Sequence, residues 1–338
     1  MPPLWSLGWH ASAYAYQNQS DVQENIDNYA KDNIPLEGIW LDIPYMDGYA
    51  DFSVNTTAFP TLKQMTDTIH ANNQRMIVIL DAGISGMDAQ NKYFSQAAQA
   101  NVLLKSAINP DVDNGFLTNH VWPNKTVFLD FFAGAARDIW AQGINDLWAK
   151  VPFDGLWLDM NEATGFCNGE CPTGIVPNYT TVGEVRKRFL EAYGESEVNH
   201  TWWTSYDTQD VISSYDLPFI PGGRWNLDNM SLSLNATHPS NGFTEYNVHN
   251  LFGHVEGMVT HEIMTNQTPG ATPIPNTRSF LLSRSTFAGS GAYVQHWLGD
   301  NHRTWEDMKN SIAGVMNFNM FGIPMVGPDT CGFFGADG

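Results

Sequence analysis

Five aspartates stand just beyond apolar segments of the chain, where their side chains could act together. They are Asp42, Asp81, Asp159, Asp300 and Asp329. A single carboxylate at the end of a strand often only caps the next helix or turn, but five in succession favour an acidic pocket. Two carboxyl groups that face each other, one ionised and one kept protonated by its surroundings, are the groups with which glycosidases break glycosidic bonds.

The segments that carry these aspartates are short apolar runs without a period of two, which is typical of strands buried on both faces of a parallel sheet. Helical spacing is expected between the runs, near residues 20–30, 62–69, 135–150, 251–259 and 308–316. Ser20 and Gln23 could form a capping pair for the first helix. The expected strands lie near Leu4, Ile39, Ile77, Leu156, Phe280, Gln295 and Met325.

This alternation predicts the α/β class and a (β/α)8 TIM barrel that is incomplete, since about seven of the eight strands can be found. The carboxyl ends of barrel strands converge on one mouth, so the five aspartates are candidates for a single site.

Composition narrows the partners that the chain could have. With 36 Asp and Glu against 16 Lys and Arg, the net charge of -20 would repel nucleic acid and anionic membranes, which favours a neutral ligand. No apolar run reaches about eighteen residues, so no transmembrane segment is expected. The ten His residues form no metal motif and no phosphate-binding glycine loop follows a strand, so we expect no metal and no cofactor. The sequence leaves the oligomeric state open.

Eight Asn-x-Ser/Thr sequons suit a chain of the secretory pathway, extracellular or lysosomal/vacuolar, although chance in an Asn-rich sequence explains them equally well. They begin at Asn18, Asn55, Asn124, Asn178, Asn199, Asn229, Asn235 and Asn266. Cys167 and Cys171 are close enough to form a disulfide across a short loop, and Cys331 is expected to be half of a truncated one.

Two segments resemble signatures of glycoside hydrolase family 31. Residues 155–162 (GLWLDMNE) resemble the family's nucleophile segment, and Ser283 to Ser290 followed by His296 to Asp300 resembles its arginine-to-acid segment. Further landmarks match at 2–10, 40–47, 121–123, 249–253 and 326–333. The resemblance implies one catalytic barrel over 1–338, within which 172–245, having no landmark, would be a long insertion.

By this resemblance the protein would be a retaining α-glucosidase acting on terminal, non-reducing α-linked glucose. Asp159 would be the nucleophile that forms a glycosyl intermediate and Asp300 the general acid/base, with carboxyl groups about 5–5.5 Å apart. Asp42 and Arg284 would hold ring hydroxyls, Arg284 would also place positive charge near Asp159, and Glu162 would be a structural hydrogen-bonding residue. The remaining substrate-binding residues implied are Tyr14, Ile84, Trp122, Trp157, Met160, Trp297, Asp329 and Phe333. For each hydrophobic one taken singly, core packing is the other interpretation.

The chain departs from the family pattern in several places, one of which is the loop after the first strand, where Tyr14-Ala15-Tyr16 replaces the more usual aromatic-Gly-Tyr. Ala163 and Thr164 stand where Pro-Ser is common, which is closer to eukaryotic secreted α-glucosidases than to the trimming glucosidase of the endoplasmic reticulum. After Gly332 the expected second cysteine, eighth strand and histidine are missing, as are flanking β domains, so we expect a fragment with little activity by itself. Alternatives are an α-xylosidase, transglucosidase or α-glucan lyase of the same family, or an inactive carbohydrate-binding fragment.

Overall fold

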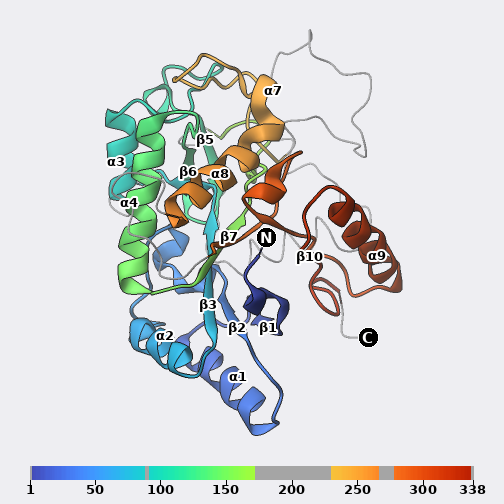
Figure 1. Ribbon diagram of the computed structural model, residues 1–338. Coiled ribbons are helices and arrows are strands. Elements are labelled where there is room, and N and C mark those ends of the chain that lie inside the picture. Colours follow the sequence, from blue (N-terminus) through green and yellow to red (C-terminus); the bar gives the residue numbers. More distant parts are fainter. Residues whose placement is uncertain (1, 88–90, 172–229, 266–277, 336–338) are drawn as a thin grey trace.

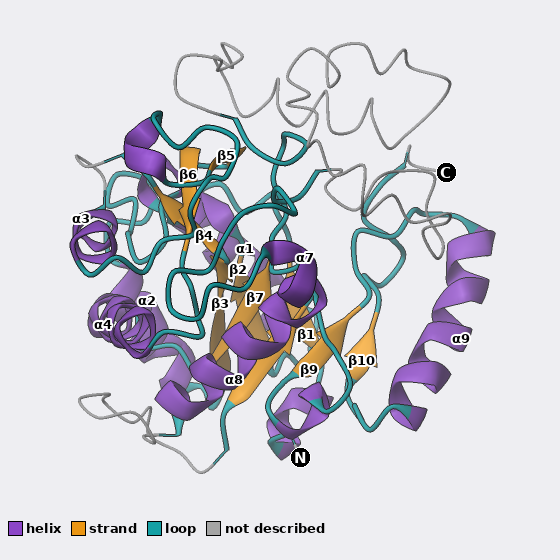
Figure 2. Cartoon of the chain, turned by 90° about the horizontal axis from the view of Figure 1, so that it is seen from above, coloured by secondary structure: helices purple, strands orange, loops and turns teal. Residues whose placement is uncertain are grey.

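A curled sheet of seven parallel strands forms the centre of the computed structural model, which describes residues 2–87, 91–171, 230–265 and 278–335 (Figure 1). The strands, in their order across the sheet, are β1 (His10–Ser12), β2 (Gly38–Leu41), β3 (Arg75–Asp81), β7 (Gly155–Asp159), β8 (Phe280–Ser283), β9 (Gln295–Trp297) and β10 (Val326–Gly327). β1 and β10 are the two edges, so the described part of the chain forms an open, incomplete TIM barrel (Figure 2). The predicted fold class is confirmed.

Helices alternate with these strands along the chain. They are α1 (Gln19–Lys31), α2 (Leu62–Ala71), α3 (Lys92–Gln99), α4 (Gly134–Lys150), α7 (Glu245–Val248), α8 (Phe252–Met264) and α9 (Trp305–Met320). The apolar faces expected from the spacing are seen in α2, where Leu62, Met65 and Ile69 are buried. None of the helices in the described ranges combines the length and apolar character that crossing a membrane requires.

Two local predictions at the N-terminal end were wrong. Residues Leu4–Leu7 form a 3₁₀ helix and not a strand, because Leu4 and Leu7 remain 85% and 67% exposed and do not enter the core. The cap of α1 is Asn18 and not Ser20: its side chain accepts the N–H of Ser20 (2.9 Å), and Asp21 accepts the N–H of Asn18 (3.2 Å). Asn18 and Asp21 form a complete capping box two positions before the expected one.

A second, antiparallel sheet of three strands follows the carboxyl end of β3. It consists of β4 (Gly83–Ser85), β6 (Asn124–Phe128) and β5 (Thr118–Val121), and the turn between β5 and β6 carries Trp122. Of the predicted insertion, residues 172–229 lie outside the described residues. Its end returns to this region, where Thr237 pairs with Lys105 and Leu232 with Gly169. The insertion itself stays a prediction.

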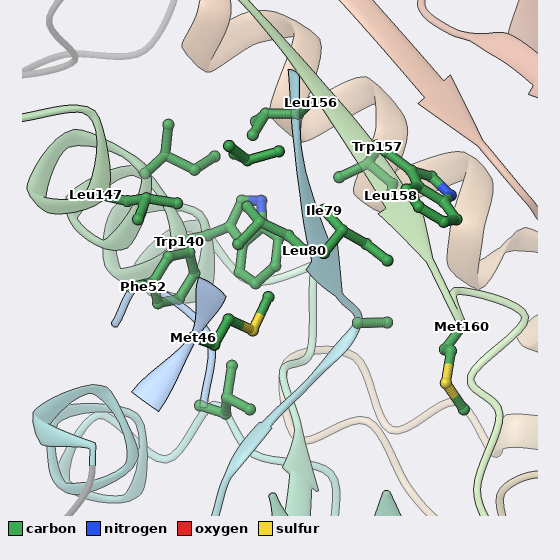
Figure 3. Packing of buried hydrophobic residues seen from close by; sticks show 14 of the residues in the cluster. Met46, Phe52, Ile79, Leu80, Trp140, Leu147, Leu156, Trp157, Leu158 and Met160 are labelled. Atoms are coloured by element: carbon green, nitrogen blue, oxygen red, sulfur yellow. The ribbon is translucent and has the colours of Figure 1, made fainter. Parts of the chain in front are cut away.

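The core lies mainly between the outer face of the sheet and the helices. Trp140 of α4 contacts Phe52 with ring centroids 5.0 Å apart, and Gly143 is needed beside it because an added Cβ would lie 2.5 Å from the Phe52 ring. Figure 3 shows Trp140 and Phe52 on one side of β3 and Trp157 on the other. α9 forms as expected, but it buries none of its residues, and Met308, Ile312 and Met316 are more than half exposed.

Short 3₁₀ helices complete the described structure. Besides Leu4–Leu7 they are Ile43–Tyr45, Asp47–Tyr49, Asp113–Gly115, His249–Leu251 and Ser290–Ala292. Two of them immediately follow β2, so that the chain turns sharply at the mouth of the barrel. That loop carries Asp42 at its start and Asp51 near its end.

Candidate active site

The register of the sheet places three charged residues side by side at the carboxyl ends of their strands. Asp81 of β3 pairs with Asp159 of β7, and Trp157 pairs with Leu282 of β8. Because side chains alternate with a period of two, Arg284 continues the row beside Asp159. The N–H of Arg284 donates to the carbonyl of Leu158 (3.1 Å), which extends the pairing beyond the end of β8. Asp159 is therefore flanked by Asp81 on one side and by Arg284 on the other.

Arg284 joins two carboxylates. Its Nη1 lies 3.0 Å from Oδ1 of Asp159, and its Nε and Nη2 donate to the two carboxylate oxygens of Glu162 at 3.1 and 2.6 Å. Thr164 hydrogen-bonds to both Glu162 and Arg284. Glu162 thus acts as a hydrogen-bonding partner of the arginine, in line with the expectation for it, and Arg284 places its charge beside Asp159.

Burial and these charges set the protonation of the pair. Burial raises the pKa of Asp159 to about 6, while Arg284 opposes the rise and Glu162 adds to it. Burial also acts to raise the pKa of Glu162, but the charge and hydrogen bonds of Arg284 outweigh it and hold that pKa below its usual value. The two carboxylates in turn raise the pKa of the guanidinium, although burial alone would lower it.

Asp300 follows β9 in a left-handed conformation, with a φ of 58°. Its N–H donates to Oδ2 of Asp329 (2.7 Å), and the indole N–H of Trp297 donates to Oδ1 of the same carboxylate (3.3 Å). Gly299 is required between them, because a Cβ there would lie 1.8 Å from the Trp297 ring. Burial and then the charge of Asp159 raise the pKa of Asp300 to about 7, with only partial opposition from Arg284.

Asp42 and Asp329 both interact with neighbouring backbone. Asp42 accepts the N–H of Ile43 (2.7 Å) and so caps the 3₁₀ helix that follows β2, while burial raises its pKa to about 7. Asp329 uses both carboxylate oxygens to hold Trp297 and Asp300. The structure thus gives Asp329 a positioning contact, whereas its binding of substrate remains a prediction.

The hydrophobic residues expected around the substrate fall into several places. Trp157 lies between Trp40 and Trp297, with ring centroids 6.1 and 4.8 Å away. Trp122 packs edge-on against Phe166 at 5.0 Å. Tyr14 is partly buried and is hydrogen-bonded to Tyr49. Ile84 and Met160 both belong to the buried core cluster. Phe333 is 38% exposed and packs beside Phe334.

The predicted disulfide between Cys167 and Cys171 is present. It closes a loop that is organised around the buried side chain of Asn119, which donates to the carbonyls of Cys167 and Gly169 (both 3.3 Å). Cys331 is exposed and forms no disulfide within the described part of the chain.

Two buried carboxyl groups near the site were missed from the sequence. Asp51 is 3% exposed and Glu256 of α8 is 0% exposed. Glu256 lies between Phe252 and Thr260 on the buried face of its helix, and a charged residue at that spacing was the signal that could have identified it. Asp51 has no such signal, because the loop that carries it is irregular.

This arrangement can perform acid–base and nucleophilic chemistry on a neutral substrate. One carboxylate is paired with a cation, and a second carboxyl group is kept protonated to higher pH, which is the division of roles that a retaining glycosidase needs. Across the described ranges, no group of three or more His, Cys, Asp or Glu side chains is arranged to hold a metal ion.

Comparison with known proteins agrees with this chemistry. Residues 1–338 match the family model described as the glycosyl hydrolases family 31 TIM-barrel domain. Alpha-xylosidase 1 of Arabidopsis thaliana is 36% identical over 342 residues, which cover 98% of this chain and 34% of that protein. An alpha-glucosidase of Mucor javanicus is 33% identical over 344 residues, covering 98% of this chain and 38% of that protein. The chain therefore spans about a third of the length of these relatives.

A solved structure shares the fold. A chain of the ER glucosidase II heterodimeric complex superimposes with a TM-score of 0.72 at 23% identity, covering 98% of this chain and 29% of that one. At this level of identity the likeness concerns the architecture alone, and the two named relatives differ in the sugar that their names specify.

Proposed function

The chain belongs to glycosyl hydrolase family 31, and we propose that the protein is a retaining α-glucosidase that removes terminal α-linked glucose from maltose-like oligosaccharides and starch ends. Asp159 attacks the anomeric carbon and forms a covalent glycosyl ester while Asp300 donates its proton to the leaving oxygen. Asp300 then accepts a proton from water, which attacks the ester and releases glucose with its configuration retained.

The contrast between the two carboxyl groups carries this proposal. Asp159 is 3.0 Å from a guanidinium, which favours its charged form. Asp300 has its pKa raised to about 7 by burial and by the charge of Asp159. At a pH between about 6 and 7 the first is mainly ionised and the second mainly protonated.

The substrate would be held on both sides of this pair. Asp42 and Arg284 offer hydrogen bonds to ring hydroxyls, and Trp157 and Trp297 offer aromatic surface. The rest of the substrate-binding surface would come from Tyr14, Ile84, Trp122, Met160 and Phe333. Asp329, which accepts the N–H of Asp300, would complete it. A neutral α-glucoside fits a protein whose net charge of -20 disfavours anionic ligands.

Similarity to the Arabidopsis α-xylosidase favours a second candidate, an α-xylosidase with the same two carboxyl groups. Xylose lacks the hydroxymethyl group of glucose, so the two activities differ in the wall that meets this group. Transglucosidase and α-glucan lyase chemistry would also use Asp159, and a carbohydrate-binding protein without turnover would use neither carboxyl group for chemistry.

Rates with nitrophenyl α-glucoside and nitrophenyl α-xyloside separate the first two candidates, and the anomeric form of the first product, followed by NMR, tests retention. Asp159→Ala should abolish turnover of every substrate. Asp300→Ala should lose far more activity on a poor leaving group than on a dinitrophenyl one, because the latter needs no proton. Asp138→Ala, on the exposed face of α4, is the matched control and should behave as native. A first product of inverted configuration would contradict the proposal.

We also propose that the protein enters the secretory pathway. The disulfide of Cys167 suits an oxidising compartment, and Asn124, an exposed residue at the start of β6, begins a sequon. Asn124→Gln should then remove one enzymatically releasable glycan from the secreted protein, whereas Asn241→Gln, exposed but outside any sequon, should leave the glycan pattern unchanged. An unglycosylated native protein would contradict this route.

A further inference from the structure

Asp81 occupies the flank of Asp159 opposite to Arg284. The two aspartates are register partners on adjacent strands, so their Cβ atoms are neighbours about 5 Å apart on the same face of the sheet. The carboxylate proposed as nucleophile therefore has a cation on one side and a second carboxyl group on the other. The chemistry proposed above uses the cation and leaves Asp81 without a role.

Asp81 is buried without a hydrogen-bonding partner for its carboxyl group. It is 1% exposed, and neither carboxyl oxygen has a partner among the described residues. Asp51, itself 3% exposed, accepts the backbone N–H of Asp81 at 3.1 Å through one oxygen, while its other oxygen has no partner within those residues. An ionised carboxylate in such a place would be costly, because a buried charge needs a partner.

The loop that delivers Asp51 adopts an unfavourable backbone. Tyr49 and Phe52 have φ values of 58° and 64°, in the left-handed region that bulky side chains seldom adopt. The Phe52 side chain is buried and packs on Tyr93 and Trp140, with ring centroids 4.9 and 5.0 Å away. The fold thus maintains a strained turn that holds the carboxyl group of Asp51 against the backbone N–H of Asp81.

Arg284 only partly offsets a charge on Asp81, because other groups already engage its guanidinium. All of its described polar contacts go to Asp159, Glu162 and Thr164. The titratable groups that interact electrostatically with Asp81 and Asp51 are Asp42, Tyr45, Asp159, Glu256 and Arg284. Burial, followed by the charges of Asp51 and Asp159, raises the pKa of Asp81 well above its usual range. A proton on Asp81 removes the conflict.

We propose that Asp81 is a positioning residue, which as a neutral carboxylic acid donates its proton in a hydrogen bond to the carboxylate of Asp159. This bond favours the ionised nucleophile and fixes its orientation from the side that Arg284 does not reach. Asp51, by accepting the N–H of Asp81, holds the donor in place. The inference rests on the proposed function only in calling Asp159 the nucleophile.

Three variants test this role. Asp81→Asn keeps a neutral donor and should retain kcat/KM within about 3-fold, whereas Asp81→Leu removes the donor and should lower kcat by about 10–100-fold, the range of one hydrogen bond to a charged group. KM should stay within about 2-fold of native in both, since neither change touches the substrate. Ile79→Val, two residues earlier on the same face, is the control for a purely structural defect and should leave the pH profile unchanged. Asp81→Leu with native kcat, or Asp81→Asn as impaired as Asp81→Leu, would overturn the proposal.

Infrared spectroscopy provides a readout that needs no turnover. Burial also raises the pKa values of Asp42 and Asp300 to about 7, so the comparison is made at about pH 8 as a difference spectrum. The native protein minus Asp81→Asn should contain the C=O stretch of one protonated carboxylic acid. If that variant does not fold, the same difference is taken between the native protein and Asp81→Leu. Absence of the band overturns the inference. If the native protein shows the band but cleaves no glycoside, the proposed function is contradicted, whereas the inference about Asp81 is still supported.

Discussion

Replacing Arg284 by glutamine should move the acidic limb of the pH–rate profile upward. Arg284 is the cation in contact with Asp159, with 3.0 Å between Nη1 and Oδ1, and both side chains are mostly buried. Burial already raises the pKa of Asp159 to about 6, and the guanidinium is the main influence that keeps it from rising further. Glutamine is neutral and similar in length, so the change removes mainly the charge.

The size of the effect follows from the geometry. At 3.0 Å and an effective dielectric constant of about 20, one such pair is worth about 5 kcal/mol. Glu162 shares the guanidinium and repels Asp159, so we take about half of this value as the loss that Asp159 experiences. At about 1.4 kcal/mol per pKa unit, the pKa would rise from about 6 to about 8. The ionised fraction at pH 6, and with it kcat/KM, would fall by about 50-fold.

The assay is the pH dependence of kcat/KM on a nitrophenyl α-glycoside the native protein cleaves. Arg137→Gln is the control, because Arg137 pairs with Glu262 at 3.5 Å near the surface and should leave the profile unchanged. If Arg284→Gln lowers kcat/KM equally at every pH, with the acidic limb in its native place, Arg284 serves only substrate binding and the electrostatic reasoning fails.

Three further predictions concern protonation and packing. The native profile of kcat/KM should be a bell that rises as Asp159 deprotonates near pH 6 and falls as Asp300 deprotonates near pH 7, and a single limb would contradict the pairing. Burial opposes the charge on His238, but its carboxylate partners Asp130 and Glu245 outweigh burial and raise its pKa from 6.5 to about 9. The charged histidine should therefore stabilise the fold by about 3 kcal/mol below pH 6.5. In denaturant titrations, the difference in unfolding free energy between the native protein and His238→Asn should shrink as the pH rises through 9. Gly299→Ala should lower kcat by at least about 10-fold with little loss of unfolding free energy, because its Cβ would displace Trp297 beside the acid/base; native kcat would show that the turn can relax.

The strand ends of the site could be predicted because the signal is local. An apolar run followed by Asp is visible around Asp159, and parallel pairing alone then brings Asp81 and Arg284 to either side of it. Glu162 could also be interpreted correctly, since it lies three positions beyond the strand and its partner arginine stands in a recognisable segment. Asp81 and Asp159 required only periodicity and topology, whereas Arg284 was identified through its resemblance to a family segment.

Other features depend on conformations that no sequence pattern encodes. The hydrogen bonds of Asp329 to Trp297 and to Asp300, which has a left-handed backbone, were not foreseen, while its binding of substrate stays a prediction. Asp51 reaches the site through a strained turn, and hydrophobic periodicity contains no information about such turns. The apolar run at Leu4 was mistaken for a strand because so short a run does not distinguish a strand from a 3₁₀ helix, and the strand begins only at His10.

The protonation of the acids explains how so acidic a site can serve a neutral sugar. Burial raises the pKa values of Asp42 and Asp300 to about 7 and that of Asp81 well above its usual range, so near pH 6.5 these groups are largely neutral. Glu162 remains ionised and offsets Arg284. The one unbalanced negative charge among these groups then lies on Asp159, where positive charge develops on the sugar in an oxocarbenium-like transition state. A neutral ground-state substrate gains little from this charge, whereas the transition state gains much, and such a difference is what accelerates a reaction.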